Sequence, residues 1–100
     1  MSDAAALRLP GSATMKTAAA LVAEVDAALA AAQGRLVIDA SALAELDTAA
    51  VALLLHAQRG AKARGLALQV SGAPAKLQAL AALYGVSELL PLSSAGAAAT

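Results

Sequence analysis

The sequence contains no cysteine, phenylalanine or tryptophan, and only one tyrosine and one histidine among its 100 residues. Without cysteine the chain has no disulfide, no thiolate zinc site and no cysteine nucleophile, and this composition fits a reducing compartment. One histidine and no cysteine also give no spacing typical of metal ligands. We therefore expect no metal ion and no cofactor.

Net charge is absent as well, because seven basic side chains balance seven acidic ones. No basic stripe of the kind that binds a phosphate backbone is present, so we do not expect nucleic-acid binding. Charged residues interrupt every apolar run before it reaches the roughly 18 residues that a membrane span needs. The first residues, Met1-Ser2-Asp3, do not start a secretory signal. We expect a soluble, cytoplasmic protein.

Hydrophobic residues make up 60% of the sequence, which at this length predicts one small globular domain over residues 1–100. Much of that fraction is alanine, which buries little area per residue. The core must therefore come from 18 leucines, six valines and one isoleucine.

The hydrophobic pattern predicts alternating strands and helices. The expected strands are a short edge strand at Leu7–Leu9, a strand at 35–39 that is buried on both faces, a strand at 66–70, and a strand or turn within 86–92. The expected helices cover 14–32, 48–63 and a third segment after the turn 71–74, which places Leu77, Leu80 and Leu83 on one face and ends at Gly85. Residues 93–100 resemble a frayed tail.

This alternation predicts an α/β domain with a small sheet of about four strands, in which helical crossovers make neighbouring strands parallel. Functional groups in such sheets gather beyond the carboxyl ends of the strands. The loop from Ala40 to Asp47 follows one of these ends. It is therefore the first place to look for a functional site.

The helix expected over 48–63 has two different faces when its residues are placed at steps of about 100°. One face carries Val51, Leu53, Leu54, Leu55, Ala57 and Ala61, and we expect it to pack on the sheet. The opposite face carries Thr48, Ala52, His56, Arg59 and Ala63. A solvent-exposed face usually carries several Glu or Lys residues, whereas this one is mostly small. Either alanine is simply abundant everywhere, or small residues let a partner approach closely.

Asp47 and Thr48 stand where this helix begins. A carboxylate or hydroxyl at a helix start most often caps the helix and contributes about 1 kcal/mol. Asp47 could supply the cap and leave Thr48 in the first turn. A phosphate on Thr48 would add roughly −1.5 to −2 charges beside the helix N–H groups and beside Asp47. The sequence leaves a capping role and a docking or regulatory role open.

No catalytic constellation is evident. His56 lies two helical turns beyond Thr48, which is out of hydrogen-bond reach within one helix. The Gly-x-Ser-x-Gly elbow and the glycine-rich phosphate loops are missing from the sequence. We therefore expect a protein that is not an enzyme.

Four motifs carry a resemblance to a known family. In order they are Ile38-Asp39-Ala40-Ser41, Leu46-Asp47-Thr48-Ala49-Ala50-Val51-Ala52-Leu53-Leu54-Leu55-His56, Gly65-Leu66-Ala67-Leu68 and Leu83-Tyr84-Gly85-Val86. Together they resemble the STAS domain family, which is named for sulfate transporters and anti-sigma factor antagonists. Within it, the likeness over about 36–92 is greatest to the cytoplasmic STAS subunit of the Mla-type phospholipid transport ABC complex. The resemblance implies a STAS-like small mixed sheet with flanking helices.

The resemblance also implies a function. It is that of a non-enzymatic subunit that binds and supports the ABC transporter ATPase, and is peripheral to the inner membrane through this partner. Asp47, Thr48, Ala52, His56 and Arg59 are then the expected partner-binding residues. The alternative is an anti-sigma factor antagonist that a kinase phosphorylates at Thr48. A third class, a lipid-binding carrier, would need an apolar cavity for which this core has little room.

Two features remain open. Only one strand is evident before the first helix, where the family usually has a pair, so an exposed sheet edge could support a homodimer. Tyr84, the single aromatic residue, could pack on the core or contact a partner.

Overall fold

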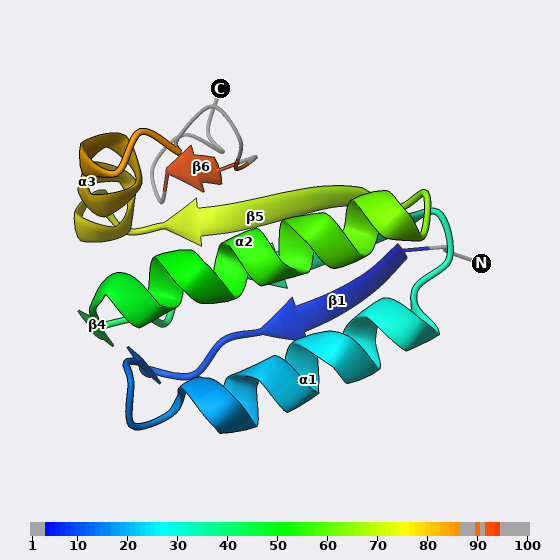
Figure 1. Ribbon diagram of the computed structural model, residues 1–100, viewed down its shortest axis with the longest axis horizontal. Coiled ribbons are helices and arrows are strands. Elements are labelled where there is room, and N and C mark those ends of the chain that lie inside the picture. The colour runs from blue at the N-terminus through cyan, green and yellow to red at the C-terminus, as the bar shows by residue number, and fades with distance from the viewer. Residues whose placement is uncertain (1–3, 87–89, 91, 95–100) are drawn as a thin grey trace.

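The computed structural model describes residues 4–86, 90 and 92–94. This part of the chain forms three helices and six strands (Figure 1). In chain order they are β1 (Ala4–Arg8), β2 (Ser12–Ala13), α1 (Ala18–Ala31), β3 (Arg35–Asp39), β4 (Glu45–Leu46), α2 (Thr48–Ala63), β5 (Ala67–Ala73), α3 (Ala75–Leu83) and β6 (Leu92–Ser94). The predicted α/β architecture is confirmed.

The main sheet has four strands in the order β1-β3-β5-β6, and every described pair is parallel. The expected number of strands is therefore confirmed, whereas the expectation of a mixed sheet is wrong for the described residues. The physical reason is the connectivity. Each strand is joined to its neighbour in the sheet by a helical crossover, and such a crossover makes the two strands parallel.

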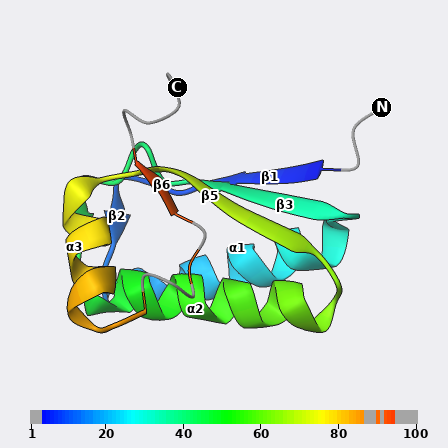
Figure 2. The same cartoon turned by 90° about the horizontal axis from the view of Figure 1, so that it is seen from above.

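The strands follow one another across the sheet without a reversal of order. Right-handed crossovers that all step in one direction place their helices on the same face. Figure 2 shows α1 and α2 along one face of β1, β3 and β5, with α3 at one end. The other face carries no helix among the described residues.

This one-sided cover corrects the prediction that β3 is buried on both faces. Leu36 and Ile38 are fully buried under the helices, whereas Arg35 is exposed and Val37 is only half-buried. The apolar run Leu36-Val37-Ile38 resembles a two-sided buried strand, but the topology leaves one side open. β1 lies at the sheet edge, as predicted, but it covers Ala4–Arg8 rather than Leu7–Leu9. A homodimer through this edge stays a prediction.

The core lies between the sheet and the two long helices. α1 contributes Leu21, Val25 and Leu29 at helical spacing, and all three are buried. α2 approaches α1 closely at Gly60, where an added Cβ would lie 2.5 Å from Cδ1 of Leu29. The predicted inner face of α2 is confirmed for Val51, Leu53, Leu54, Ala57 and Ala61, whereas Leu55 is only half-buried.

A second strand before α1 corrects the expectation of only one. β2 pairs with β4 in a separate two-stranded parallel ladder. Next to it, the carbonyl of Gly11 accepts hydrogen bonds from the N–H groups of Ala44 and Glu45. Two-residue strands are too short to leave a periodic pattern, so no pattern in the sequence predicts them.

α1 begins at Ala18, four residues later than the pattern predicts. Thr17 holds the preceding turn, because its Oγ1 accepts a hydrogen bond of 3.0 Å from the N–H of Thr14. Hydroxyl side chains that bind nearby main-chain groups compete with helical hydrogen bonding. The first turn of the expected helix is therefore a loop.

Two further predictions near the C-terminal part need correction. The segment 71–73 belongs to β5, which continues past Val70 with an irregular register, and is not a turn. In α3, Leu77 is buried and Leu80 half-buried, whereas Leu83 is 75% exposed. Six residues at about 100° each place Leu83 about 120° from Leu77, so the two cannot share a narrow face.

Only the first residue of β6, Leu92, falls within the segment 86–92 where a strand or turn is expected, and Ser93 and Ser94 fall in the expected tail. The rest of the predicted tail, 95–100, and most of 86–92 lie outside the described residues. None of the three described helices is both long and apolar enough to cross a bilayer.

We expect Gly72→Ala to destabilise the fold more than Gly85→Ala. Both glycines have left-handed φ angles, +66° and +71°, which cost an alanine about 1–2 kcal/mol. At Gly72 an added Cβ would also lie 2.7 Å from Cβ and 3.0 Å from Cα of Ser41, whereas nothing lies within 4 Å at Gly85. Urea unfolding of both variants measures the difference. Equal losses of stability would contradict the close packing of β5 against the loop after β3.

We also expect Asp39 to make stability depend on acid pH. The hydroxyl of Ser41, then the Ser41 N–H at 2.9 Å from Oδ1, and finally the charge of Arg8 hold the pKa of Asp39 below its ordinary value. A lowered folded pKa gives stability that is present above the unfolded pKa of about 3.9 and is lost as pH falls through the folded pKa. Between about pH 5 and pH 3, Asp39→Asn should therefore lose less stability than the unchanged protein in urea titrations. Identical losses would contradict this.

Candidate functional site

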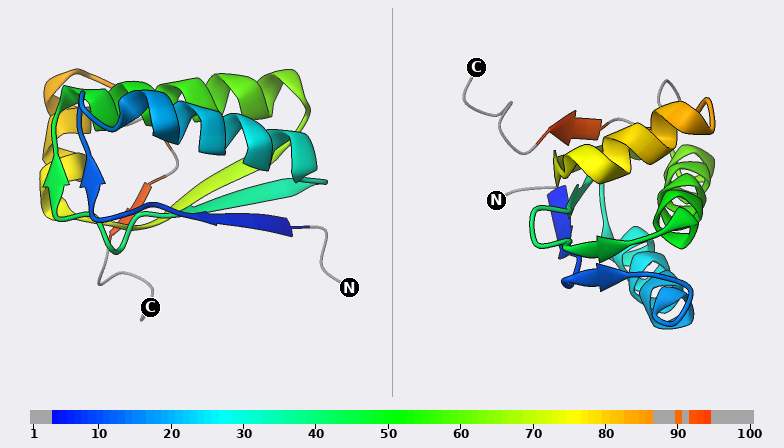
Figure 3. Two further views of the ribbon diagram at one scale, coloured as in Figure 1. Left: turned by 90° about the horizontal axis from the view of Figure 1, so that it is seen from below. Right: turned by 90° about the vertical axis from the view of Figure 1, so that its left-hand side faces the viewer.

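The first turns of α1 and α2 lie at the same end of the molecule. Figure 3 shows β2 and β4 side by side at this end, each leading toward the start of its helix. The loop before α1 and the start of α2 are 30 residues apart in sequence, and the small ladder brings them together. The candidate site is built from these two segments.

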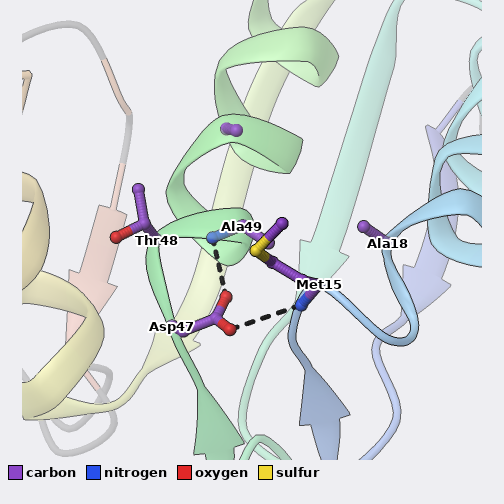
Figure 4. Close-up of a pocket in the computed structure, with 6 residues that line it drawn as sticks. Met15, Ala18, Asp47, Thr48 and Ala49 are labelled. Carbon is purple, nitrogen blue, oxygen red and sulfur yellow. Dashed lines mark hydrogen bonds between the residues drawn. The ribbon is translucent and has the colours of Figure 1, made fainter.

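Asp47 joins the two segments through its carboxylate. Oδ1 accepts a hydrogen bond of 2.8 Å from the N–H of Ala49, and Oδ2 accepts one of 3.3 Å from the N–H of Met15 (Figure 4). The main-chain carbonyl of Asp47 also accepts a hydrogen bond of 2.9 Å from Ala50. Asp47 therefore caps α2, and Thr48 occupies the first turn. The capping role, one of the two roles that the sequence left open, is thus confirmed for Asp47.

The cap changes what the helix start offers to a ligand. The N–H groups of Ala49 and Ala50 already have partners in Asp47. They are two of the first-turn donors that would otherwise stabilise an anion. An added phosphate would also meet the carboxylate of Asp47.

Thr48 is exposed, and its hydroxyl shares a hydrogen bond of 2.9 Å with the hydroxyl of Tyr84. Tyr84 follows α3, so this bond links the ends of two helices. Half of the Tyr84 surface is exposed, which means that the ring is not buried in the core. No local pattern predicts this hydrogen bond, because Thr48 and Tyr84 are 36 positions apart in the chain.

A shallow hollow of about 440 Å³ lies between the starts of α1 and α2. Its walls are mostly apolar and come from Met15, Ala18, Asp47, Thr48, Ala49 and Ala52 (Figure 4). Met15 is 82% exposed, which is unusual for so apolar a side chain. Sequence reasoning missed Met15 and Ala18, because a methionine in a short loop has no motif to mark it.

The predicted outer face of α2 is exposed as expected at Thr48, Ala52, Arg59 and Ala63. The fifth residue of this face, His56, is half-buried. Its Nε2 lies 2.7 Å from Oδ1 of Asp26 on α1, and both side chains are about half exposed. Thr48 and Ala52 therefore line the hollow, whereas His56 forms a bridge to α1 further along α2.

The comparisons with known proteins agree with this fold. The family model described as "Mlab, STAS domain" matches residues 1–91. No protein with a curated description matches the chain. A solved structure of a sulfate transporter family protein from Wolinella succinogenes is similar, with a TM-score of 0.74 and 17% identity over 90% of this chain and 75% of that one.

Two further solved structures are similar. The anti-sigma factor antagonist SpoIIAA in its unphosphorylated form has a TM-score of 0.71 and 15% identity, covering 91% of this chain and 80% of its own. A putative anti-sigma factor antagonist from Thermotoga maritima has a TM-score of 0.80 and 12% identity, covering 99% and 86%. These identities are low, so the likeness shows the fold alone. With the family model spanning most of its length, the chain belongs to the STAS domain family.

Proposed function

We propose that this chain is a non-enzymatic interaction subunit that binds and supports the ATPase of an Mla-type inner-membrane phospholipid transporter. The observation that carries the proposal is the exposed apolar hollow beside Thr48, at the start of α2. The description of the matching family model, which names Mlab, supports this choice of partner. The protein would be cytoplasmic and reach the inner membrane only through its partner.

The proposed docking surface contains Asp47, Thr48, Ala52, His56 and Arg59 and extends to Met15. Ala52 is small and exposed, so a partner backbone can approach α2 closely there. Met15 is flexible and can adapt its shape to an apolar side chain that enters the hollow. The Thr48 hydroxyl provides a polar contact at the centre, and the Asp47 carboxylate also holds the loop of Met15 at the edge of this surface.

The arrangement of polar groups supports a binding role over a catalytic one. His56 is engaged with Asp26 and lies two turns along the helix from the Thr48 hydroxyl. The Thr48 hydroxyl shares its hydrogen bond with the hydroxyl of Tyr84. The Asp47 carboxylate, which also lines the hollow, accepts hydrogen bonds from the N–H groups of Ala49 and Met15. Among the described residues, the recorded side-chain partner of the Thr48 hydroxyl is Tyr84 and not a carboxylate or an imidazole.

The docking surface predicts the effect of two substitutions on association. Ala52→Arg would fill the approach to the hollow with a long charged side chain, and Thr48→Glu would place a carboxylate beside Asp47. Each should abolish co-purification with the transport ATPase. A desolvated, unpaired charge at an interface costs several kcal/mol, roughly a thousandfold in affinity. Both positions are exposed, so the thermal midpoint should change little.

Ala30→Arg is the matched control, because Ala30 is an equally exposed alanine in the last turn of α1, away from the hollow. This variant should associate like the unchanged protein. Association that survives Ala52→Arg and Thr48→Glu in folded protein would sink the proposal.

The alternative, an anti-sigma factor antagonist switched by phosphorylation, is favoured by one observation: the Thr48 hydroxyl is exposed at a helix start. We expect no stable phosphate there, because Asp47 repels it and already occupies the N–H groups of Ala49 and Ala50. Incubation with an anti-sigma factor kinase and ATP, followed by intact mass measurement, tests this. A gain of one phosphate that Thr48→Ala prevents would favour the alternative.

A further inference from the structure

The exposed stripe of α2 changes its chemistry along the helix. At about 100° per residue, an arc of about 80° contains Thr48, Ala52, Leu55, Arg59 and Lys62. All except the half-buried Leu55 are exposed. The stripe therefore starts with a hydroxyl and small apolar residues and ends with two cations.

The cations at the end of α2 belong to a larger basic region. Arg64 follows the last turn of α2, and Arg35 begins β3 directly beside the first residue of β5. All four basic side chains are exposed: Arg35, Arg59, Lys62 and Arg64. They are four of the seven basic residues in a chain with no net charge. We call this region the basic end.

The described carboxylates lie elsewhere. Asp39, Glu45 and Asp47 stand at the carboxyl ends of the strands or beside β4, at the opposite end of the molecule from the basic end. Glu24 and Asp26 lie midway along α1, and Asp26 is held by His56. Within the described residues no carboxylate is recorded in an ion pair with a cation of the basic end.

Large exposed apolar side chains lie at the end of α2 opposite the basic end. Met15 lines the hollow beside Thr48, Tyr84 bonds to Thr48, and Leu83 precedes Tyr84 in the chain. In the described part of the chain these are the large apolar residues that stand out from the surface. Figure 1 shows that α2 runs along the sheet. This helix therefore connects an apolar end with the basic end.

We propose that the partner lies along α2, with an apolar side chain in the hollow beside Thr48 and carboxylates against Arg59 and Lys62. This inference rests on the proposed function and names the chemistry of the partner surface. Eleven residues separate Thr48 from Arg59, which corresponds to about 16 Å along a helix. A partner helix of about three turns, with an apolar start and acidic residues further on, fits this span.

Charge complementarity selects a protein surface over a lipid surface. Arginine binds carboxylates through two parallel hydrogen bonds, and three of the four basic side chains are arginines. Binding to a bilayer needs apolar side chains beside the cations, because these enter the membrane interface. The large exposed apolar side chains lie instead at the opposite end of α2. The helix dipole also favours cations in the last turn, so the test must separate stability from association.

The test measures the affinity for the transport ATPase of two variants, Arg59→Glu and Lys62→Glu. The control variant is Lys76→Glu. Lys76 is an exposed helical lysine on α3, so its reversal changes the net charge equally. Each reversal on α2 should weaken binding about tenfold, and Lys76→Glu less than about twofold. The losses should shrink between about 0.1 M and 0.5 M salt, because the Debye length falls from about 10 Å toward 4 Å. Arg59→Lys should lose less affinity than Arg59→Glu, because it keeps the charge but not the two parallel hydrogen bonds of the guanidinium.

The possible outcomes distinguish a failure of the inference from a failure of the proposed function. If Ala52→Arg abolishes binding while Arg59→Glu and Lys62→Glu behave like Lys76→Glu, the proposed function stands and the acidic partner surface is wrong. If the α2 reversals lower only the thermal midpoint, the cations serve the helix dipole and the inference is wrong. If the ATPase affinity is unchanged and Arg59→Glu instead releases the protein from phosphatidylglycerol vesicles, the basic end contacts lipid and the inference is overturned. If the unchanged protein does not bind the ATPase, the proposed function fails and the inference fails with it.

Discussion

The strands of the main sheet lie side by side in chain order, and right-handed crossovers connect them. As a result, α1 and α2 pack on the same face of the sheet and begin at the same end of the molecule. Everything proposed for this protein depends on that constraint. It brings the loop of Met15 next to the start of α2, where the carboxylate of Asp47 binds both segments. Because the strand order does not reverse, the sheet has no switch point of the kind that forms a ligand-binding crevice in other α/β proteins. The surface on which the proposals rest is the outer side of the helices at the end where α1 and α2 start.

Abundant alanine gives this surface its shape. Small side chains on α2 let α1 approach closely, as the contact of Gly60 with Leu29 shows inside the molecule. The same property at Ala52, on the outside, leaves a shallow hollow that a partner side chain can enter. A helix that carried Glu and Lys at these positions would be well solvated but would have no such recess.

The capping arrangement also shapes the proposed role of Thr48. Since Asp47 satisfies the first N–H groups of α2, Thr48 is not needed for helix stability, and its hydroxyl bonds to Tyr84 instead. This pairing presents a rigid polar point beside an apolar recess and a half-exposed aromatic ring. Such a combination fits a protein contact, in which a few anchors are surrounded by neutral small residues.

The sequence by itself determined the alternation of strands and helices and the two faces of α2, because these depend on local propensity and on periodicity within one element. It offered Asp47 as a possible cap, and the structure decided for that role. Tertiary structure alone decided the rest. The Leu36-Val37-Ile38 run cannot show that one side of β3 stays open, since this follows from the direction of crossovers elsewhere in the chain. In the same way, Met15, the Tyr84 bond and the His56–Asp26 bridge join residues that are about 30 or more positions apart. No local pattern encodes such contacts, because they exist only once the helices and strands have packed.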